Sequence, residues 1–277
     1  MHQDNYYAVP LLASRYDADT EGRSDLTFYL ALARELSPSA VADIGAGTGL
    51  FCSLLARAEL TRGNNARVKP DVGHGAGTAG RSLKITGVEP QQTMLDVARR
   101  QPLADRIDWV HGTAGDLTEA AYDLVFMTGH VSQYFLDDAA WEEVLQQISR
   151  ALVPGGHLAF EARNAAAQGW RQWNDDGPRA VTGGTLRRTT TMTGDLATHI
   201  DEWTLEDRTF TTRETLRFPD DAAILRGVEA AGLVIDRLWG GWDGSSATPL
   251  SAERIVLARK LYEARAKGRA DGGRLRS

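Results

Sequence analysis

Residues 41–50, Val-Ala-Asp-Ile-Gly-Ala-Gly-Thr-Gly-Leu, constrain the fold of this chain more than any other stretch. Residues 41–44 are mostly apolar and predict a short buried strand, and residues 50–60 carry apolar side chains at helical spacing. The glycines between them allow left-handed dihedrals and bring bare backbone close to a ligand. The stretch therefore predicts a strand, a ligand-binding turn and a helix.

The spacing of the glycines indicates which kind of ligand the turn binds. A dinucleotide-binding turn has the pattern G-x-G-x-x-G. Here Gly45, Gly47 and Gly49 form G-x-G-x-G, and Asp43 precedes the first glycine by two residues. This spacing disfavours a dinucleotide.

Composition excludes several classes of protein. Of 277 residues, 42% are hydrophobic and 25% charged, which is typical of a globular protein with a sizeable core. The net charge of −6 argues against nucleic acid or an anionic membrane as partner. No run of apolar residues is long enough to span a membrane, and the start of the chain has no leader pattern. Cys52 is the only cysteine, which excludes an internal disulfide. We expect a cytoplasmic protein.

Further apolar segments predict the rest of an α/β sheet. Strands are expected at residues 83–89, 107–111, 122–127 and 157–161, and helices at 25–36, 137–152 and 222–231, with a further helix beginning at Pro90. Ligands of open α/β sheets lie at the carboxyl ends of the strands. Glu89 and the turn at residues 128–130 are therefore expected beside the glycine turn.

Four features in this order resemble the class I S-adenosylmethionine (SAM)-dependent methyltransferases of the small-molecule type. They are the turn at residues 43–49, Gly-Val-Glu-Pro at 87–90, Gly-Thr-Ala-Gly-Asp-Leu at 112–117 and Leu-Val-Pro-Gly-Gly at 152–156. The resemblance covers about residues 25–260 and implies a seven-stranded Rossmann-like sheet with helices on both faces. It implies SAM as cofactor and S-adenosylhomocysteine (SAH) as product. The cofactor-binding residues implied are Asp43, Gly45, Ala46, Gly47, Gly49, Glu89, Pro90, Asp116, Leu117 and Thr128.

In this family the glycine turn lines the methionine part of the cofactor, and the acid after the second strand accepts from the ribose hydroxyls. By this resemblance, Asp116 is expected to accept a hydrogen bond from the adenine amino group, and Leu117 is expected to pack against the adenine ring. Glu89 follows Gly49 by 40 residues, where the family has about 20. A Gly-rich, polar segment at 61–82, expected to be a flexible surface insertion, accounts for the excess. A helix-capping acid is the alternative reading of Glu89.

Residues 1–36 resemble the cap that covers the cofactor in small-molecule methyltransferases, with Tyr16-Asp17 leading to the helix that contains Tyr29. Aromatic rings and carboxylates suit a sulfonium or ammonium cation; packing of the helix onto the sheet is the alternative. His130 is the best candidate for a base, and Tyr16 and Tyr134 are candidate donors at the methyl site. A histidine in such a turn could instead bind only backbone.

After residue 163 the pattern changes to Thr-rich alternation. Strands at 185–193, 196–205 and 208–218 predict an antiparallel insertion at 184–218 that covers the mouth of the active site. Trp170 and Trp173 form either an aromatic wall for the acceptor or simply core. Residues 233–239 and 254–259 close the sheet of a single domain that spans 1–260, and a charged tail follows at 261–277.

The chain is therefore predicted to be an enzyme that transfers a methyl group from SAM to an N or O atom of a small molecule. Met-Thr-Gly-His at 127–130 stands where methyltransferases of nucleobase and glutamine amino groups carry Asn-Pro-Pro-Tyr, which disfavours those acceptors. No cluster at metal-ligand spacing is present in the sequence. The alternatives are a SAM-fold protein that binds without turnover and a nicotinamide-dependent oxidoreductase, the latter disfavoured because the chain lacks a Tyr-x-x-x-Lys pair. The Thr-rich strands would allow a homodimer.

Overall fold

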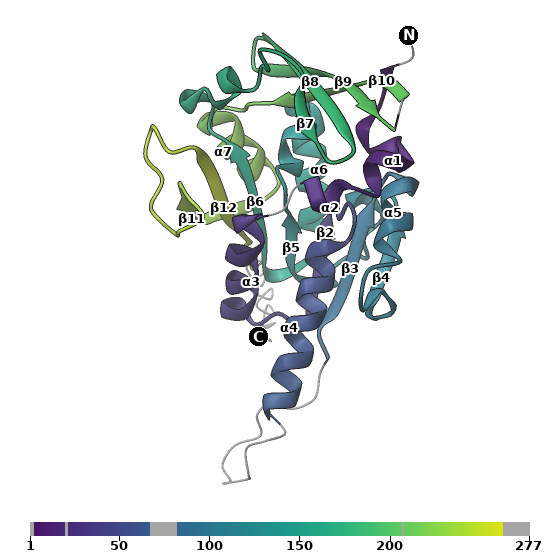
Figure 1. The fold of residues 1–277 in the computed structure, drawn as a ribbon. Coiled ribbons are helices and arrows are strands. Elements are labelled where there is room, and N and C mark those ends of the chain that lie inside the picture. The colour runs from purple at the N-terminus through teal and green to yellow at the C-terminus, as the bar shows by residue number, and fades with distance from the viewer. Residues whose placement is uncertain (1–2, 20–21, 67–81, 207, 263–277) are drawn as a thin grey trace, which may run out of the picture.

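The computed structural model describes residues 3–19, 22–66, 82–206 and 208–262 (Figure 1). Within these residues the larger sheet is seven-stranded, as predicted. Its order is β11 (Leu233–Trp239), β12 (Glu253–Lys260), β6 (Leu152–Arg163), β5 (Tyr122–Met127), β2 (Ala40–Ile44), β3 (Lys84–Glu89) and β4 (Ile107–His111). The pairs from β6 to β4 are parallel, and β12 is antiparallel to both β6 and β11. The order reverses at β2, which pairs with both β3 and β5. Such a switch point is where open α/β sheets bind ligands.

Both faces of this sheet are covered by helices. On one face, α3 (Ser24–Leu36) and α4 (Leu50–Ala66) pack against alternate strand residues such as Val41 and Leu124. On the other face, α6 (Asp138–Ala151) and α7 (Asp221–Ala230) pack against their neighbours, such as Ala42 and Val125. This alternation follows from the two-residue period of a strand. Helix α6 buries residues at positions i, i+3, i+4 and i+7, and each large side chain contributes about 1.5–3 kcal/mol.

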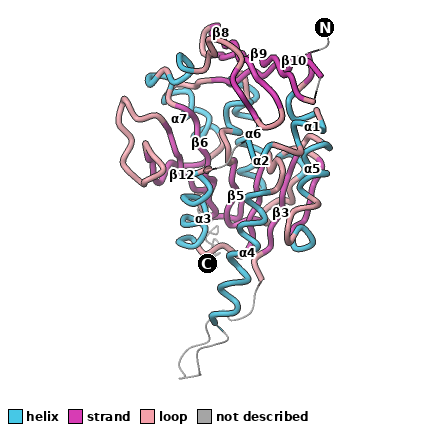
Figure 2. The backbone as a smooth tube through the Cα atoms, in the orientation of Figure 1, coloured by secondary structure: helices cyan, strands magenta, loops and turns pink. Residues whose placement is uncertain are grey.

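A second, five-stranded sheet lies over one end of the first sheet (Figure 2). Its long strands are β8 (Gly184–Thr193), β9 (Leu196–Leu205) and β10 (Arg208–Arg217), which confirms the predicted antiparallel segment almost to the residue. The sequence did not predict the two short edge strands. β7 (Arg179–Val181) pairs with β8, and β1 (Gln3–Asp4) pairs with β10 in parallel. The N-terminal strand therefore joins the second sheet.

The N-terminal segment continues over the same end of the molecule. It comprises a 3-10 turn, η1 (Tyr6–Ala8), and two single-turn helices, α1 (Pro10–Ala13) and α2 (Tyr16–Asp19). Three further 3-10 turns, η2 (Ala104–Arg106), η3 (Ala114–Asp116) and η4 (Val131–Tyr134), lie in the loops of the large sheet. Two more, η5 (Ala165–Ala167) and η6 (Gly169–Gln172), lead from β6 to the second sheet.

Helix α5 (Gln92–Ala98) begins two residues after Pro90, the predicted start. Gln91 is extended, with φ −95° and ψ 112°, and its backbone N–H donates to Glu89 Oε1 at 2.8 Å. The Glu89 carboxylate thus fixes the residues between strand and helix, and Pro90 lies in that connection.

Two other elements extend several residues beyond their predicted bounds, whereas most of the rest differ by about one residue or less. α4 continues to Ala66, so residues 61–66 of the predicted insertion are helical, and residues 67–81 lie outside the described residues. Residues 153–156, between the predicted helix that ends at residue 152 and the predicted strand that begins at residue 157, belong to β6, which starts at Leu152. Gly155 there has φ 82°, and the pairing with β5 shifts between Tyr122 and Leu124. Most of the predicted tail, residues 263–277, also lies outside the described residues. In the described part of the chain, no helix has the length and apolarity needed to cross a membrane.

Candidate active site

A cavity of about 730 Å³ lies at the carboxyl edge of the parallel strands, between the two sheets. The turns that follow β2, β3, β4 and β5 all contribute to its wall, together with residues of β10, η1, η4, α2, α4, α5 and α6. Of the residues predicted from sequence, the cavity is lined by Gly45, Ala46, Gly47, Glu89, Pro90, Thr128 and Tyr16.

The glycine turn places its backbone on the cavity wall. Gly45, Gly47 and Gly49 have φ values of 68°, 57° and 76°, which favour glycine. At Gly45 an added Cβ would lie 2.7 Å from a Val131 methyl carbon, so the turn also packs tightly on η4. Gly49 does not line the cavity: a Cβ there would lie 2.5 Å from the Trp109 ring. The third glycine is therefore explained by packing against β4.

Glu89 is buried at the end of β3 and faces the cavity. Its Oε2 accepts from the Gly47 N–H and its Oε1 from the Gln91 N–H, both at 2.8 Å. Burial raises the pKa of this carboxyl above its ordinary value, and these two backbone donors oppose the rise. Each carboxylate oxygen has further accepting capacity, so the side chain can still accept from a vicinal diol.

Asp43 lies beneath the glycine turn and outside the cavity lining. It is 1% exposed, and burial raises the pKa of its carboxyl to about 8. Its Oδ2 lies 3.8 Å from Cys52 Sγ, whereas Oδ1 has no hydrogen-bond partner among the described residues. The predicted direct contact of Asp43 with a cofactor stays a prediction, and its place in the structure is under the turn.

Asp116 and Leu117 also lie off the cavity wall. Asp116 Oδ2 accepts from the Thr113 N–H at 2.8 Å, and the two residues form a capping box around η3. Leu117 is 5% exposed and belongs to the core on the α6 side of the sheet. Gly112, Thr113 and Ala114, from the same loop, line the cavity in their place. The sequence located the right loop, but the side chains that reach the cavity differ from those predicted.

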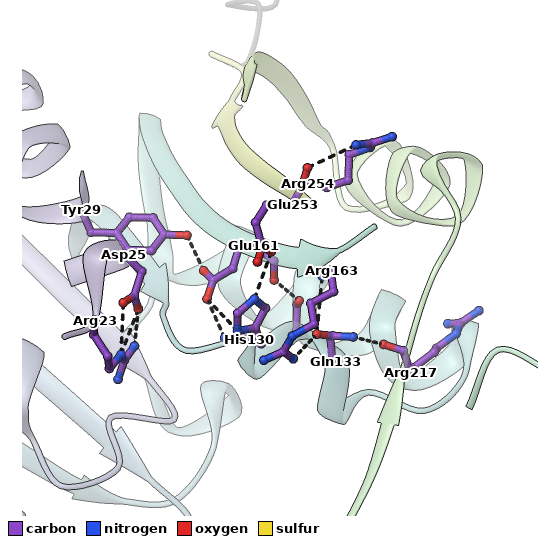
Figure 3. A network of polar contacts seen from close by, with 11 residues as sticks. Arg23, Asp25, Tyr29, His130, Gln133, Glu161, Arg163, Arg217, Glu253 and Arg254 are labelled. Atoms are coloured by element: carbon purple, nitrogen blue, oxygen red, sulfur yellow. Dashed lines mark hydrogen bonds and ion pairs between the residues drawn. The ribbon is translucent and has the colours of Figure 1, made fainter. Parts of the chain in front are cut away.

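His130 follows the cavity residues Thr128 and Gly129 but is not part of the lining (Figure 3). Its backbone N–H donates to Glu161 Oε1 at 2.5 Å, and its Nε2 lies 3.0 Å from Glu253 Oε2. Tyr29 donates to the other oxygen of Glu161, which is fully buried. His130 is thus held behind the turn by two carboxylates, Glu161 at its backbone N–H and Glu253 at its imidazole. This geometry does not support the prediction that His130 is a base.

Tyr16 and Tyr134 line the cavity together with two residues that the sequence analysis did not assign to the site, Tyr7 and Glu214. The Tyr7 and Tyr134 hydroxyl oxygens are 2.5 Å apart, and both phenols contact Glu214 Oε1. Tyr7 comes from η1, Tyr134 from η4 and Glu214 from β10. No local pattern could have grouped them, because the Tyr7–Glu214 contact joins residues 207 positions apart.

The N-terminal segment closes the cavity from above. Asp17 accepts a hydrogen bond from Thr48 in the glycine turn, and its other oxygen accepts from Gln101 Nε2 at 2.7 Å. Arg23, which lines the cavity, is paired with Asp25 at the start of α3. Tyr29 is fully buried, is not part of the cavity lining, and points toward Glu161 (Figure 3).

The two candidate wall residues Trp170 and Trp173 do not line the cavity. Trp170 packs on Phe218 with ring centroids 4.7 Å apart, and Trp173 packs on His199 at 4.8 Å. Arg163 lies over the Trp173 ring at 5.1 Å. Both tryptophans thus pack beside the second sheet. Among the described residues, no group of three or more His, Cys, Asp or Glu side chains could hold a metal ion.

A family model described as a methyltransferase domain matches residues 71–156. The match includes Glu89, the loop at 112–117 and the strands from β3 to the start of β6, and it begins after the glycine turn. No curated protein matches the chain by sequence.

Solved methyltransferase structures match almost the whole chain. The CcbJ methyltransferase from Streptomyces caelestis has a TM-score of 0.71 at 17% identity, over 94% of this chain and 100% of that one. The sugar N-methyltransferase KedS8 from Streptoalloteichus has a TM-score of 0.68 at 16% identity, over 95% and 96%. SAM-bound CalS10, an amino pentose methyltransferase from Micromonospora echinaspora, has a TM-score of 0.62 at 17% identity, over 94% and 100%. At such identities the likeness shows the shared fold.

Proposed function

We propose that this chain is a class I, Rossmann-like, SAM-dependent methyltransferase and that it methylates an N or O atom of a small-molecule acceptor. The fold and the family match at residues 71–156 support this enzyme class. The small-molecule acceptor and the residues that act on it are the proposed part. KedS8 and CalS10, which are named for sugar N- and amino pentose methylation, have a similar fold and support an acceptor of that size.

The observation that carries this proposal is the position of Glu89 opposite the exposed backbone of the glycine turn. A nucleoside needs an acceptor for its ribose hydroxyls, and Glu89 presents a buried carboxylate at the cavity wall. Backbone from Gly45 to Gly47 leaves room for an amino-acid chain beside it, and Met94 and Ala114 add apolar surface for a base. These residues fit SAM.

SAM, when bound, supplies a methyl group on a sulfonium centre that is open to in-line displacement. The chain's own contribution is to position the two reactants and to exclude water, and positioning alone can supply roughly 7–11 kcal/mol. Residues 213–215 of β10 and residues 5, 7 and 16 of the N-terminal segment form a further side of the cavity. We assign the acceptor to that side, where Tyr7, Tyr16 and Tyr134 gather.

Several properties stay predictions from the sequence: the domain boundaries, the absence of a nucleic-acid partner, a homodimer and a cytoplasmic location. We expect one domain over residues 1–260, with residues 1–36 as the cap and residues 184–218 as the acceptor-side sheet. The lone Cys52 is consistent with a reducing compartment.

The first experiment is calorimetric titration of the wild type and Glu89→Ala with SAM, SAH and NADH. SAM and SAH should bind the wild type in saturable fashion, and Glu89→Ala should weaken both by about tenfold or more, because it removes a charged hydrogen-bond acceptor. Glu202→Ala removes an exposed carboxylate from β9 and is the matched control.

Failure of both adenosyl ligands to bind would refute the proposed cofactor site, and binding of NADH in their place would favour the oxidoreductase. Tight SAM binding without turnover on any amine or hydroxyl acceptor would favour the non-catalytic alternative.

A further inference from the structure

The acceptor side of the cavity contains a carboxylate whose hydrogen-bond donors are all on one of its oxygens. Tyr134 donates to Glu214 Oε1, and the Tyr7 hydroxyl lies 3.1 Å from the same oxygen. Among the described residues, none forms a hydrogen bond or an ion pair with Glu214 Oε2. The side chain is half-buried and borders the cavity, so this oxygen is available to a ligand.

The two phenols act as donors and not as bases. Burial, followed by the charge of the carboxylate and the neighbouring phenols, raises the pKa values of Tyr7 and Tyr134 well above 10. Each therefore keeps its proton at neutral pH. With one proton apiece, Tyr134 donates to Glu214, and Tyr7 donates to Glu214 or to the Tyr134 oxygen.

The cations around the cavity leave the negative charge of Glu214 available. Arg23 is paired with Asp25 through two of its nitrogens. Arg213 borders the same cavity but is exposed, and no ion pair between it and Glu214 is present in the described part of the chain. The aromatic rings of Tyr7, Tyr16 and Tyr134, with centroids about 6.0 Å apart in the pairs Tyr7–Tyr16 and Tyr7–Tyr134, add faces that attract a cation.

We propose that Glu214 Oε2 binds the ammonium form of an amine acceptor and takes its proton before methyl transfer. This rests on the proposed function and narrows the acceptor from N or O to a basic amine. Tyr7 and Tyr134 are positioning residues that hold the carboxylate through Oε1.

The proposed reaction is a proton transfer followed by a displacement at the methyl carbon. The ammonium N–H bond breaks and its proton goes to Glu214, which leaves a lone pair on nitrogen. That lone pair forms the new N–C bond to the methyl carbon while the C–S bond electrons return to sulfur, giving neutral SAH and a methylated ammonium. Glu214 then returns its proton to water.

The test compares two probes of equal shape on the protein saturated with SAH: cyclohexylammonium chloride and cyclohexanol. Ligand-observed NMR titration gives the affinity of each for the wild type, Glu214→Gln and Glu202→Gln. The wild type should bind the ammonium about tenfold tighter than the alcohol, or more, because charged hydrogen bonds are the stronger ones. Glu214→Gln should remove this preference without changing the affinity for the alcohol, and Glu202→Gln should change neither.

SAH titration of each variant verifies that the cavity is folded. If Glu214→Gln loses SAH binding, Glu214→Asp replaces it; that variant keeps the charge but withdraws the carboxylate, and should lose at least about threefold in ammonium affinity. Absence of ammonium binding to the wild type, equal affinity for the two probes, or a preference that survives in Glu214→Gln would overturn this proposal and leave the proposed function intact. Failure of the wild type to bind SAH would overturn both.

Discussion

Asp43 shows how a residue of the glycine motif can act through its protonation state. It ends a buried strand, its only described hydrogen-bond contact is Cys52 Sγ, and burial raises its pKa to about 8. At neutral pH the folded protein therefore favours the protonated side chain, which avoids placing an unpaired charge in the core. We therefore assign Asp43 a structural role, the support of the glycine turn from beneath.

Asp43→Asn should flatten the pH dependence of stability. In the unfolded chain Asp43 releases its proton near its ordinary pKa of 3.8, whereas the folded protein keeps it up to about pH 8. Its stabilising contribution is fully present below the lower value and is lost as pH rises through the higher one. Asparagine is neutral throughout, so urea unfolding between about pH 4 and pH 8 should show the cofactor-free wild type losing stability relative to the variant. A difference that stays constant with pH, or one reproduced by the exposed control Asp105→Asn, contradicts this assignment.

At the scale of elements, the single-turn helix α2 is held on the glycine turn by side chains. A helix this short has almost no stability of its own. Asp17 accepts from Thr48 on one side and from Gln101 on the other, which joins α2 to the turn and to the end of α5. A single carboxylate thus makes the side-chain hydrogen bonds that join α2 to the turn and to Gln101.

Asp17→Ala should open this segment. Loss of two hydrogen bonds to a charged group is expected to cost about 2–4 kcal/mol locally, enough to raise the open population by tenfold or more. Limited trypsin digestion followed by mass spectrometry should show faster cleavage after Arg15 and Arg23. Asp105→Ala, which removes an exposed carboxylate, should be cleaved at the wild-type rate. Equal cleavage of Asp17→Ala and wild type would mean that apolar contacts alone hold the segment.

At the scale of the whole molecule, the two sheets are joined through buried polar contacts as well as through the cavity. Gln133, fully buried in η4, donates to the Arg217 carbonyl of β10 at 2.6 Å and accepts from Arg163 Nη1 of β6 at 2.8 Å (Figure 3). Arg217 in turn pairs with Asp138 of α6 at 2.5 Å. Because these contacts join the two sheets, we expect the sheets to unfold together.

Saturation with SAH should therefore move a single unfolding transition. At about 100 times its dissociation constant a ligand stabilises the folded state by roughly 2.7 kcal/mol, and a domain of this size gains about 2–4 °C per kcal/mol, so the midpoint should rise by about 5–10 °C. Differential scanning calorimetry with and without SAH measures this shift. Two transitions, of which only one responds to SAH, would show that the second sheet is an independent unit.

The sequence by itself determined the elements whose signals are local. The strands β4, β5 and β11 match their predicted bounds, and β8 to β10 match within about one residue, because alternation and turn residues are contained in the segments themselves. The glycine turn and Glu89 followed for the same reason, since a motif of a few residues dictates the backbone that approaches a ligand. The tertiary structure decided which side chains reach the cavity. Packing against Trp109 removed Gly49 from the wall, and Glu161 and Glu253 hold His130 behind it. Pairing of β1 with β10 placed Tyr7 beside Glu214, a contact across 207 positions. Such contacts depend on burial and on long-range strand pairing, which no local pattern encodes.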